Sequence, residues 1–560
     1  MTLTNSWSSP VYAAFTAIVV LVSGLWAQEN ANVQAAQENR ASCNLPELPR
    51  FSVDTSMPEQ AGRVIKVPAD GDFQQAIDDA RPGDMIILQA GATYTGTFTL
   101  PRKDGDGWIV VKSSANSQLP PPGTRVTPAD AEHMPKIVTA RNGQPALRTV
   151  PGAHHYRFIG VEFTTAPEVK RVSSIVEISH NKRTRLEDVP SHFVLDRVYI
   201  HGNSELNSQR GLAMNSRWTA VIDSWIDECH IHGFDSQAIC TWDGPGPFKI
   251  ENCFLEGGSE NIMFGGAKNS AECLVASDIE IRRCHFYKNP DWAKLKYPNN
   301  WAVKNLFEIK TARRVLLEGN VFENCWAEAQ TGYAFVLKSS SPSQGQPWDT
   351  TNDITIRYNR IINCVNGVAI ARHSSSGPVK PGADPTSRIL FEHNVFERFG
   401  SASDFPARSA GRMFQIAGRD FTFHHNTSWN DVNIISLTNP ATDNLVFLDN
   451  LLTPGSYGVK PDGGGVGWNP GRGSHIRGDS MMKGNTIIRV GTERARQSSP
   501  KSYPDGNLWF DSFEEAGVDP ETYRVLPNSK AKGTATDGTN PGADIDAVME
   551  ATANVRARRP

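Results

Sequence analysis

The chain has 560 residues and a formal net charge of −4, from 56 basic and 60 acidic side chains. This balance argues against a nucleic-acid partner and a polybasic membrane-surface protein, because both need a concentrated basic face. Apolar residues make up 39% of the chain and charged residues 21%, so a sizeable core is expected and global disorder is excluded.

An apolar run from Val11 to Ala27 follows a short polar start, and a small residue closes it. This pattern predicts a secretory signal peptide over residues 1–27, and hence a secreted, periplasmic or cell-surface protein. The residues before the run include no Lys or Arg, so an uncleaved N-terminal anchor is the alternative. We expect no other contact with a membrane. Residues 28–60 are rich in Ala, Gln, Asn, Glu and Pro, which predicts a linker.

The segment 72–80 has the pattern of a short amphipathic helix, with Phe73, Ala76, Ile77 and Ala80 on one face. The residues Arg-Pro-Gly-Asp at 81–84 end this helix, and the apolar segment 85–88 predicts a buried strand. Short strands and turns follow, without a long helical period.

A repeat with spacings of 24 to 39 residues then occupies most of the chain. Its aligned column consists of Val161, Val198, Trp225, Cys253, Cys284, Asn320, Asn359, Asn394, Asn426, Asn450 and Asn485. Three positions before this column, all eleven residues are apolar. Such a repeat predicts a solenoid, in which each coil buries its apolar side chains against its neighbours.

The column also predicts how neighbouring coils are joined. Coils of a β-solenoid stack about 4.8 Å apart, so the six asparagines should form a ladder of hydrogen-bonded amides. Two positions earlier, side chains that mostly alternate in charge predict a solvated ladder of ion pairs. These are Glu251, Arg282, Glu318, Arg357, Glu392 and His424.

The amphipathic cap, the strands in DMIILQAGATYTGTFTLP and WIVVKSS, and the asparagine-laddered coils together resemble the pectin-lyase-like superfamily. The resemblance implies an all-β, single-stranded right-handed parallel β-helix over residues 61–490, with an N-terminal cap helix. Residues 491–560 would then form a C-terminal tail or end cap. The superfamily includes lyases, hydrolases, esterases, epimerases and adhesins, so its fold does not settle an activity.

A partial resemblance to the chondroitinase-B and alginate-lyase-like polysaccharide lyases rests on two dipeptides. Lys338-Ser339 ends one strand, and Arg372-His373 ends a strand 34 residues later. The resemblance implies β-elimination with Lys338 as the base, Arg372 as the carboxylate clamp and His373 as a supporting donor. The family holds calcium with two carboxylates upstream of the lysine, where this sequence has Thr331 and Tyr333.

The alternation around these residues has its own physical meaning. In the segments FEIK and AFVLK the aromatic and aliphatic side chains should point inward, and Glu308, Lys310 and Lys338 outward. Two ammonium groups on adjacent coils would lower one pKa and create a base, with Lys310 tuning or replacing Lys338. Glu308 could instead pair with a lysine and cancel this effect.

Two further groups of residues are candidates for binding. Asp235, Glu256 and Glu260 lie in or near a glycine-rich stretch and, with Glu308, are candidates for a Ca²⁺ site. Paired carboxylates of this kind could also run hydrolysis. Trp242, Trp292, Trp301 and Trp348 could form a wall for sugar rings, or could simply pack the insertion onto the solenoid.

These observations favour a secreted, carbohydrate-active enzyme that cleaves an acidic, uronate-containing polysaccharide by β-elimination. A non-catalytic carbohydrate-binding or surface solenoid and a glycoside hydrolase are the alternatives. We expect a monomer with a polysaccharide substrate and no cofactor other than Ca²⁺.

Overall fold

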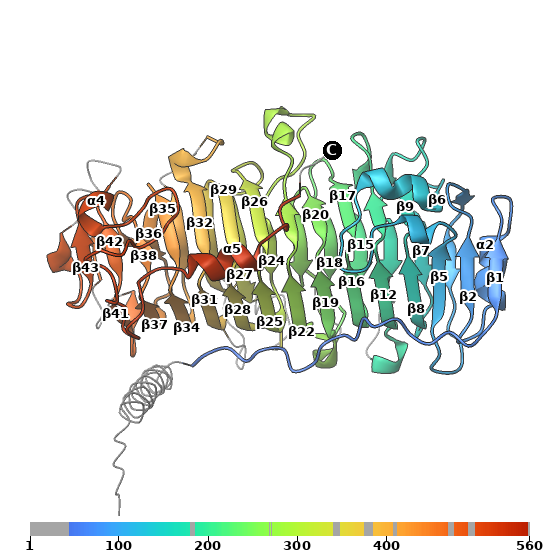
Figure 1. Ribbon diagram of the computed structural model, residues 1–560, viewed down its shortest axis with the longest axis horizontal. Helices are drawn as coiled ribbons and strands as arrows, with labels where there is room; N and C mark the ends of the chain where they lie inside the picture. The colour runs from blue at the N-terminus through green and yellow to red at the C-terminus, as the bar shows by residue number, and fades with distance from the viewer. Residues whose placement is uncertain are drawn as a thin grey trace, which may run out of the picture.

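The computed structural model describes residues 44–179, 185–267, 269, 271–339, 348–373, 385–406, 411–468, 475–490 and 499–557. The predicted signal peptide or anchor lies outside these residues. Within them, the chain winds through three long parallel sheets, as the resemblance to pectin-lyase-like proteins predicts (Figure 1). Each coil contributes a strand first to sheet A, then to sheet B and then to sheet C.

The sheets have 15, 14 and 12 strands respectively. Sheet A consists of β1 (Val64–Val67), β2 (Met85–Leu88), β5 (Ile109–Ser113), β8 (His154–Ile159), β12 (Ser191–Asp196), β16 (Arg217–Ile222), β19 (Phe248–Glu251), β22 (Ser277–Arg282), β25 (Ala312–Glu318), β28 (Thr351–Arg357), β31 (Ser387–Glu392), β34 (Arg419–His424), β37 (Thr442–Leu448), β40 (Ile476–Arg477) and β41 (Met481–Lys483). Sheet B consists of β3 (Thr93–Thr95), β6 (Lys136–Thr139), β9 (Glu162–Thr165), β13 (Tyr199–His201), β17 (Trp225–Cys229), β20 (Phe254–Gly257), β23 (His285–Tyr287), β26 (Val321–Cys325), β29 (Arg360–Cys364), β32 (Val395–Phe399), β35 (Thr427–Asn430), β38 (Leu451–Leu452), β42 (Thr486–Ile488) and β43 (Leu508–Phe510). Sheet C consists of β4 (Phe98–Leu100), β7 (Leu147–Thr149), β11 (Val176–Ile178), β15 (Arg210–Met214), β18 (Gln237–Thr241), β21 (Glu260–Phe264), β24 (Phe307–Ile309), β27 (Tyr333–Ser339), β30 (Asn366–His373), β33 (Arg412–Ile416), β36 (Asn433–Leu437) and β39 (Val459–Pro461). A separate short pair joins β10 (Arg171–Val172) to β14 (Asn207–Ser208).

The predicted cap helix is confirmed as α2 (Phe73–Asp79). Asp72 caps it by accepting a hydrogen bond from the backbone N–H of Gln75. Phe73 is buried and packs against the rings of Tyr94 and Phe98. The apolar face of the helix therefore closes the first coils against water.

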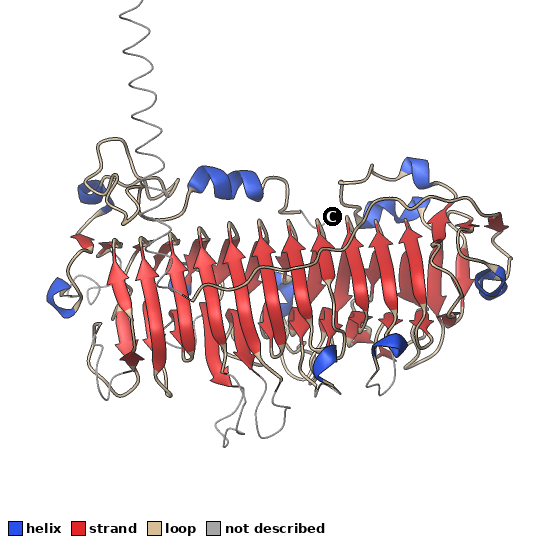
Figure 2. Cartoon of the chain, turned by 90° about the horizontal axis from the view of Figure 1, so that it is seen from below, coloured by secondary structure: helices blue, strands red, loops and turns tan. Residues whose placement is uncertain are grey.

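One continuous core runs from this cap along the solenoid. The residues three positions before the asparagine column lie directly above one another, so that Phe391 stacks on Phe423 with 5.4 Å between ring centroids. Figure 2 shows the strands of one sheet lying side by side along the length of the molecule. Stacking of identical positions explains why the apolar column was visible in the sequence.

The asparagine ladder is also confirmed. Asn359 Nδ2 donates to Asn394 Oδ1 at 3.0 Å, and Asn394 Nδ2 donates to Asn426 Oδ1 at the same distance. The ladder continues one rung beyond the predicted column, because Asn485 Nδ2 donates to Asn507 Oδ1 at 2.9 Å. Strand β43 follows that rung and pairs with β42.

One rung of the predicted column is wrong. Ser224, not Trp225, occupies the ladder position, since the backbone N–H of Val198 donates to Ser224 Oγ at 3.0 Å. Trp225 instead pairs one position later, with Tyr199 and Phe254. The apolar residue three positions earlier is accordingly Val221, which pairs with Ile250.

Both terminal segments run along the outside of the solenoid. The backbone N–H of Arg50 donates to Asp278 at 2.9 Å, and Arg157 donates to the carbonyl of Thr55 at 2.9 Å, so the first described residues follow one edge (Figure 1). The C-terminal segment contains α4 (Phe513–Ala516) and α5 (Ile545–Ala551), and α5 packs against Val395. In the described part of the chain, no helix is long and apolar enough to cross a membrane.

Candidate functional site

The outer face of sheet C carries an ionic cluster around Glu308 of β24. Lys338 Nζ, from the next strand β27, lies 3.0 Å from Glu308 Oε1, and Lys310 Nζ lies 3.5 Å from the same oxygen. The predicted neighbourhood of Glu308, Lys310 and Lys338 is therefore present. Of the two predicted alternatives, the structure has the one in which Glu308 pairs with both lysines.

Glu308 shares this position with a second buried carboxyl group, that of Glu260 in β21. Both side chains are 0% exposed. Burial raises the pKa of Glu260 to about 8, with the negative charges of Glu308 and Asp235 adding to the effect. Burial opposes ionisation of Glu308 as well, but the ammonium groups of Lys338 and Lys310 outweigh it, so its pKa is lowered. The negative charge of Glu308 is one of the causes that raise the pKa of Glu260, so the two carboxyl groups lie near each other.

Amide side chains support both carboxyl groups from one side. Gln237 Nε2 donates to Glu260 Oε2 at 2.7 Å, and Asn305 Nδ2 donates to Glu308 Oε2 at 2.9 Å. Gln237 and Glu260 are direct partners in sheet C. These bonds fix the orientation of the two carboxyl groups.

A third lysine extends the cluster. Lys304 forms an ion pair with Asp235, which thereby joins the group through its charge. Burial disfavours the charged form of Lys310, yet the carboxyl groups of Glu308, Glu260 and Asp235 outweigh it, and the pKa of Lys310 is raised. With Glu260 neutral, three ammonium groups face two carboxylates, so the cluster has an excess positive charge that suits an anionic ligand.

Calcium does not fit this arrangement. Ca²⁺ needs six to eight oxygen ligands at about 2.3–2.6 Å, mostly from carboxylates and carbonyls. Here the Glu308 carboxylate already pairs with two ammonium groups, and Glu260 is protonated near neutral pH. The two ammonium groups thus neutralise the charge of Glu308, as a bound metal ion would.

Arg372, the predicted carboxylate clamp, is not the strand partner of Lys338. The partner of Lys338 in β30 is Ala371, and the pairing shifts immediately afterwards, so that Ser339 pairs with His373. Arg372 Nη2 reaches Asp443 Oδ2 at 3.1 Å instead. Burial and the neighbouring Arg372 lower the pKa of the half-buried His373.

Glu256 lies apart from the cluster. It belongs to β20 of sheet B, whereas Glu260 begins β21 of sheet C. The backbone N–H of Glu228 donates to Glu256 Oε1 at 3.2 Å. Of the four candidate metal ligands, Asp235, Glu260 and Glu308 act on one another through their charges.

The four candidate tryptophans do not form one wall. Trp292 and Trp301 are buried in a cluster with Val303 and Trp326, and Trp301 also stacks on His230 at 3.8 Å. These two rings therefore pack the insertion onto the solenoid. Trp242 is half-buried, with the Arg210 guanidinium 4.8 Å above its ring, and the half-buried Trp348 precedes β28.

Three members of the cluster escaped the sequence analysis, namely Gln237, Lys304 and Asn305. Aligning the strands of sheet C would have found Gln237, because it occupies the same position as Glu260 one coil earlier. Lys304 and Asn305 precede β24 in a segment without strand periodicity. Their roles become visible only when Asp235 and Glu308 are placed in space.

No protein-family model matches the sequence, and no curated protein matches it. Solved structures similar to this chain include the PL6 family alginate lyase AlyGC, at 13% identity and a TM-score of 0.47, over 89% of this chain and 59% of that one. The pectate lyase Pel9A has 14% identity and a TM-score of 0.37, over 86% and 96% of the two chains. The Dettilon tailspike protein has 11% identity and a TM-score of 0.37, over 80% and 68%. The chain thus spans 59% of the length of AlyGC, and at such low identity the likeness concerns the fold alone.

Proposed function

We propose that this chain is a secreted polysaccharide lyase that cleaves a uronate-containing polymer by β-elimination on the outer face of sheet C. The observation that carries the proposal is the cluster of Lys338, Lys310 and Glu308 above the protonated Glu260. It combines a positive surface for a sugar carboxylate with groups that exchange protons.

β-Elimination requires a base at the sugar C5 proton and positive charge on the C6 carboxylate, because neutralising the carboxylate acidifies that proton. In this proposal Lys310 and Lys304 supply the positive charge. Lys338, as the neutral amine, removes the C5 proton, and Glu308 at 3.0 Å stabilises the ammonium group that results. The C4=C5 double bond forms as the bond from C4 to the leaving oxygen breaks, and the Lys338 ammonium group returns the proton to that oxygen. Since only a neutral amine can accept a proton, we expect the rate to increase as the pH rises above neutrality.

A retaining or inverting glycosidase is less compatible with this geometry. Such enzymes separate their two carboxyl groups by roughly 5–5.5 Å or 6.5–9.5 Å, with the sugar between them. Glu260 and Glu308 are both fully buried, and Gln237 and Asn305 hold their carboxyl groups. No sugar ring fits between two groups in that position.

The test is a screen of uronate polymers that follows the ultraviolet absorbance of the unsaturated product and, in parallel, the appearance of reducing ends. A lyase produces both signals, a hydrolase only the second and a binding protein neither. Lys338→Ala should lower the rate by about 10²-fold, as expected for loss of a general base. Export has a separate test, since N-terminal sequencing of secreted material should begin near Gln28.

The matched control is Lys249→Ala. Lys249 pairs with Glu251 at 2.9 Å on sheet A, and its side chain is 20% exposed, compared with 19% for Lys338. We expect Lys249→Ala to leave the rate unchanged. Equal rates for both variants would mean that the active site does not lie on this face.

A further inference from the structure

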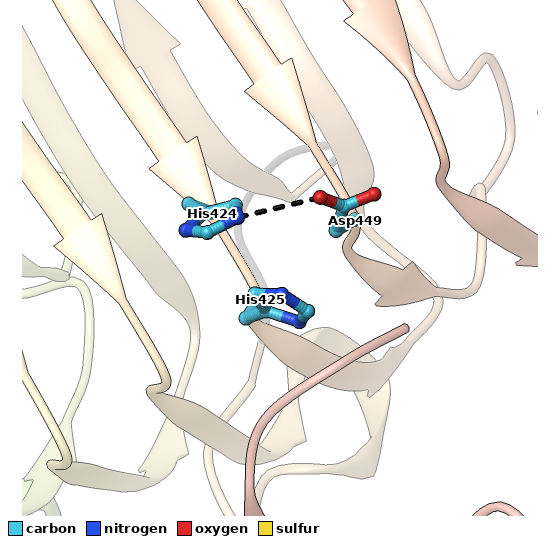
Figure 3. A group of neighbouring side chains, drawn as sticks. All are labelled: His424, His425 and Asp449. Atoms are coloured by element: carbon cyan, nitrogen blue, oxygen red, sulfur yellow. Dashed lines mark ion pairs between the residues drawn. The ribbon is translucent and has the colours of Figure 1, made fainter. Parts of the chain in front are cut away.

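A second cluster of titratable side chains lies where the strands of sheet A end and the chain turns into sheet B. His424 ends β34, and His425 follows it in the turn. Asp449 occupies the same turn position one coil later, after β37. Figure 3 shows the three side chains converging, with His424 and Asp449 in contact.

The distances within this cluster match those of a tetrahedral metal site. His424 Nε2 lies 3.3 Å from Asp449 Oδ2, and one donor atom from each of the three residues lies within 4.8 Å of the other two. Zinc binds nitrogen and oxygen ligands at about 2.0–2.2 Å, so donors of one tetrahedron are roughly 3.3–3.6 Å apart. Donor pairs at the 4.8 Å limit would therefore have to approach each other by about 1.2–1.5 Å to surround one ion.

The other polar atoms of these residues are already held, as in the outer shell of a metal centre. His424 Nδ1 lies 3.0 Å from Glu392 Oε1, and His425 Nδ1 lies 3.0 Å from the carbonyl oxygen of Gly542. Thr536 donates twice to Asp449, from its backbone N–H to Oδ1 at 2.7 Å and from its hydroxyl to Oδ2 at 2.6 Å, which leaves Oδ2 a second lone pair for an ion. Partners of this kind fix a histidine's tautomer and orient its second nitrogen toward an ion.

The charges around the two imidazoles also suit a dication. Glu392 and Asp449 contact His424, while Asp537 Oδ2 lies 3.1 Å from His425 Nε2. Asp449 is 0% exposed and His425 2%, so their charges are poorly screened by water. Three carboxylates therefore face the two imidazole rings, and one dication would offset this excess of acidic groups.

We propose that His424, His425 and Asp449 bind one zinc-class dication, with Asp537 placed to join as the fourth donor. Two imidazoles and carboxylate oxygens form a set that zinc prefers over Ca²⁺ or Mg²⁺. His425 and Asp537 also line a cavity of about 520 Å³, through which an ion can enter.

The bound ion fixes the C-terminal segment on the solenoid. Thr536, Asp537 and Gly542 all belong to that segment, and each contacts one of the ligands. The site is separate from the sheet C cluster and does not depend on the proposed lyase activity.

The test uses the full chain, stripped of metal, dialysed against zinc and then against metal-free buffer. Metal analysis should find about one zinc per chain, and His425→Gln should retain at least tenfold less. Cobalt(II) in place of zinc should give the strong visible absorption of a four-coordinate site. Circular dichroism shows whether the variant remains folded.

His285→Gln is the matched control. His285 is fully buried, its Nε2 lies 3.0 Å from Glu323 Oε2, and its Nδ1 accepts a hydrogen bond from the backbone of Ala557 in the same C-terminal segment. This variant should keep its zinc. Failure of the wild-type chain to retain zinc, or equal losses in both variants, would overturn the proposal, and the wild-type measurement decides even if His425→Gln does not fold.

Discussion

Two faces of the solenoid carry charged side chains in stacked rows, and they differ in burial. On sheet A, Glu318 pairs with Arg282 and with Arg357, the latter at 2.5 Å. These side chains are between 22% and 30% exposed. On sheet C, Glu308 likewise pairs with two cations, Lys310 and Lys338, but its own side chain is completely buried.

The comparison teaches that alternating charge alone does not mark a functional site. Around Glu318 the sheet A ladder is partly exposed to water, so each ion pair there contributes little to stability. On sheet C, burial forces Glu260 to keep its proton near neutral pH and concentrates positive charge at the surface. Burial, rather than alternating charge, therefore distinguishes the sheet C cluster from the sheet A ladder.

Matched substitutions of Glu308 and Glu318 test whether burial makes this difference. Glu308→Gln leaves two lysines without their shared counter-ion in a buried setting and should destabilise the fold by about 3 kcal/mol. Glu318→Gln, in the solvated ladder, should cost less than about 1 kcal/mol. Denaturant unfolding measures both, and equal effects would mean that burial makes no difference here.

The sequence was sufficient to predict the solenoid because the same positions stack in every coil. The asparagine ladder, the apolar column and the sheet A charges all follow from that periodicity. It failed at Trp225 because Val221 and Ile222 are both apolar, so hydrophobicity alone did not fix the alignment of this coil; the apolar position belongs to Val221.

The candidate site was only partly predictable for a related reason. Glu308, Lys310 and Lys338 were expected to be neighbours from strand alternation, and the structure places them together. Arg372 was expected beside Lys338, but the pairing shifts after Lys338 and Arg372 contacts Asp443, 71 residues later. Neither an irregularity in pairing nor a contact between distant coils leaves a periodic pattern in the sequence.

The asparagine ladder extends the comparison to uncharged side chains inside the turn. Asn394→Leu removes hydrogen bonds to Asn426 and to the carbonyl of Ile356, and leaves buried partners unsatisfied. We expect a loss of about 1–3 kcal/mol in a thermal or denaturant melt. The exposed Asn299→Leu is the control and should have little effect; an unchanged melt for Asn394→Leu would contradict the role of the ladder.

The protonated state of Glu260 predicts a pH dependence of the folding stability. Its pKa is raised from its ordinary value of 4.5 to about 8, so between these values the folded chain keeps a proton that the unfolded chain has lost. This contribution to stability is full below pH 4.5 and is lost as the pH rises toward about 8. Glu260→Gln keeps a hydrogen-bond donor without a titrating proton.

Melting temperatures of the wild type and Glu260→Gln across this range measure the effect. The wild type should lose more stability than the variant as the pH rises. Glu251→Gln on sheet A serves as the control and should follow the wild type. Parallel curves for the wild type and Glu260→Gln would show that Glu260 is ionised in the folded protein.

The smallest expected effect comes from calcium. The carboxylate of Glu308 is paired with Lys310 and Lys338, so Ca²⁺ would have to displace two ammonium groups to gain one ligand. Adding calcium to chain freed of metal on a chelating resin should change neither the rate nor the melting temperature. Zinc, added alone, should raise the melting temperature through His424, His425 and Asp449, because binding to the folded state stabilises it. A rate restored by calcium would instead mean that the lysines leave Glu308 when the substrate or a cation arrives.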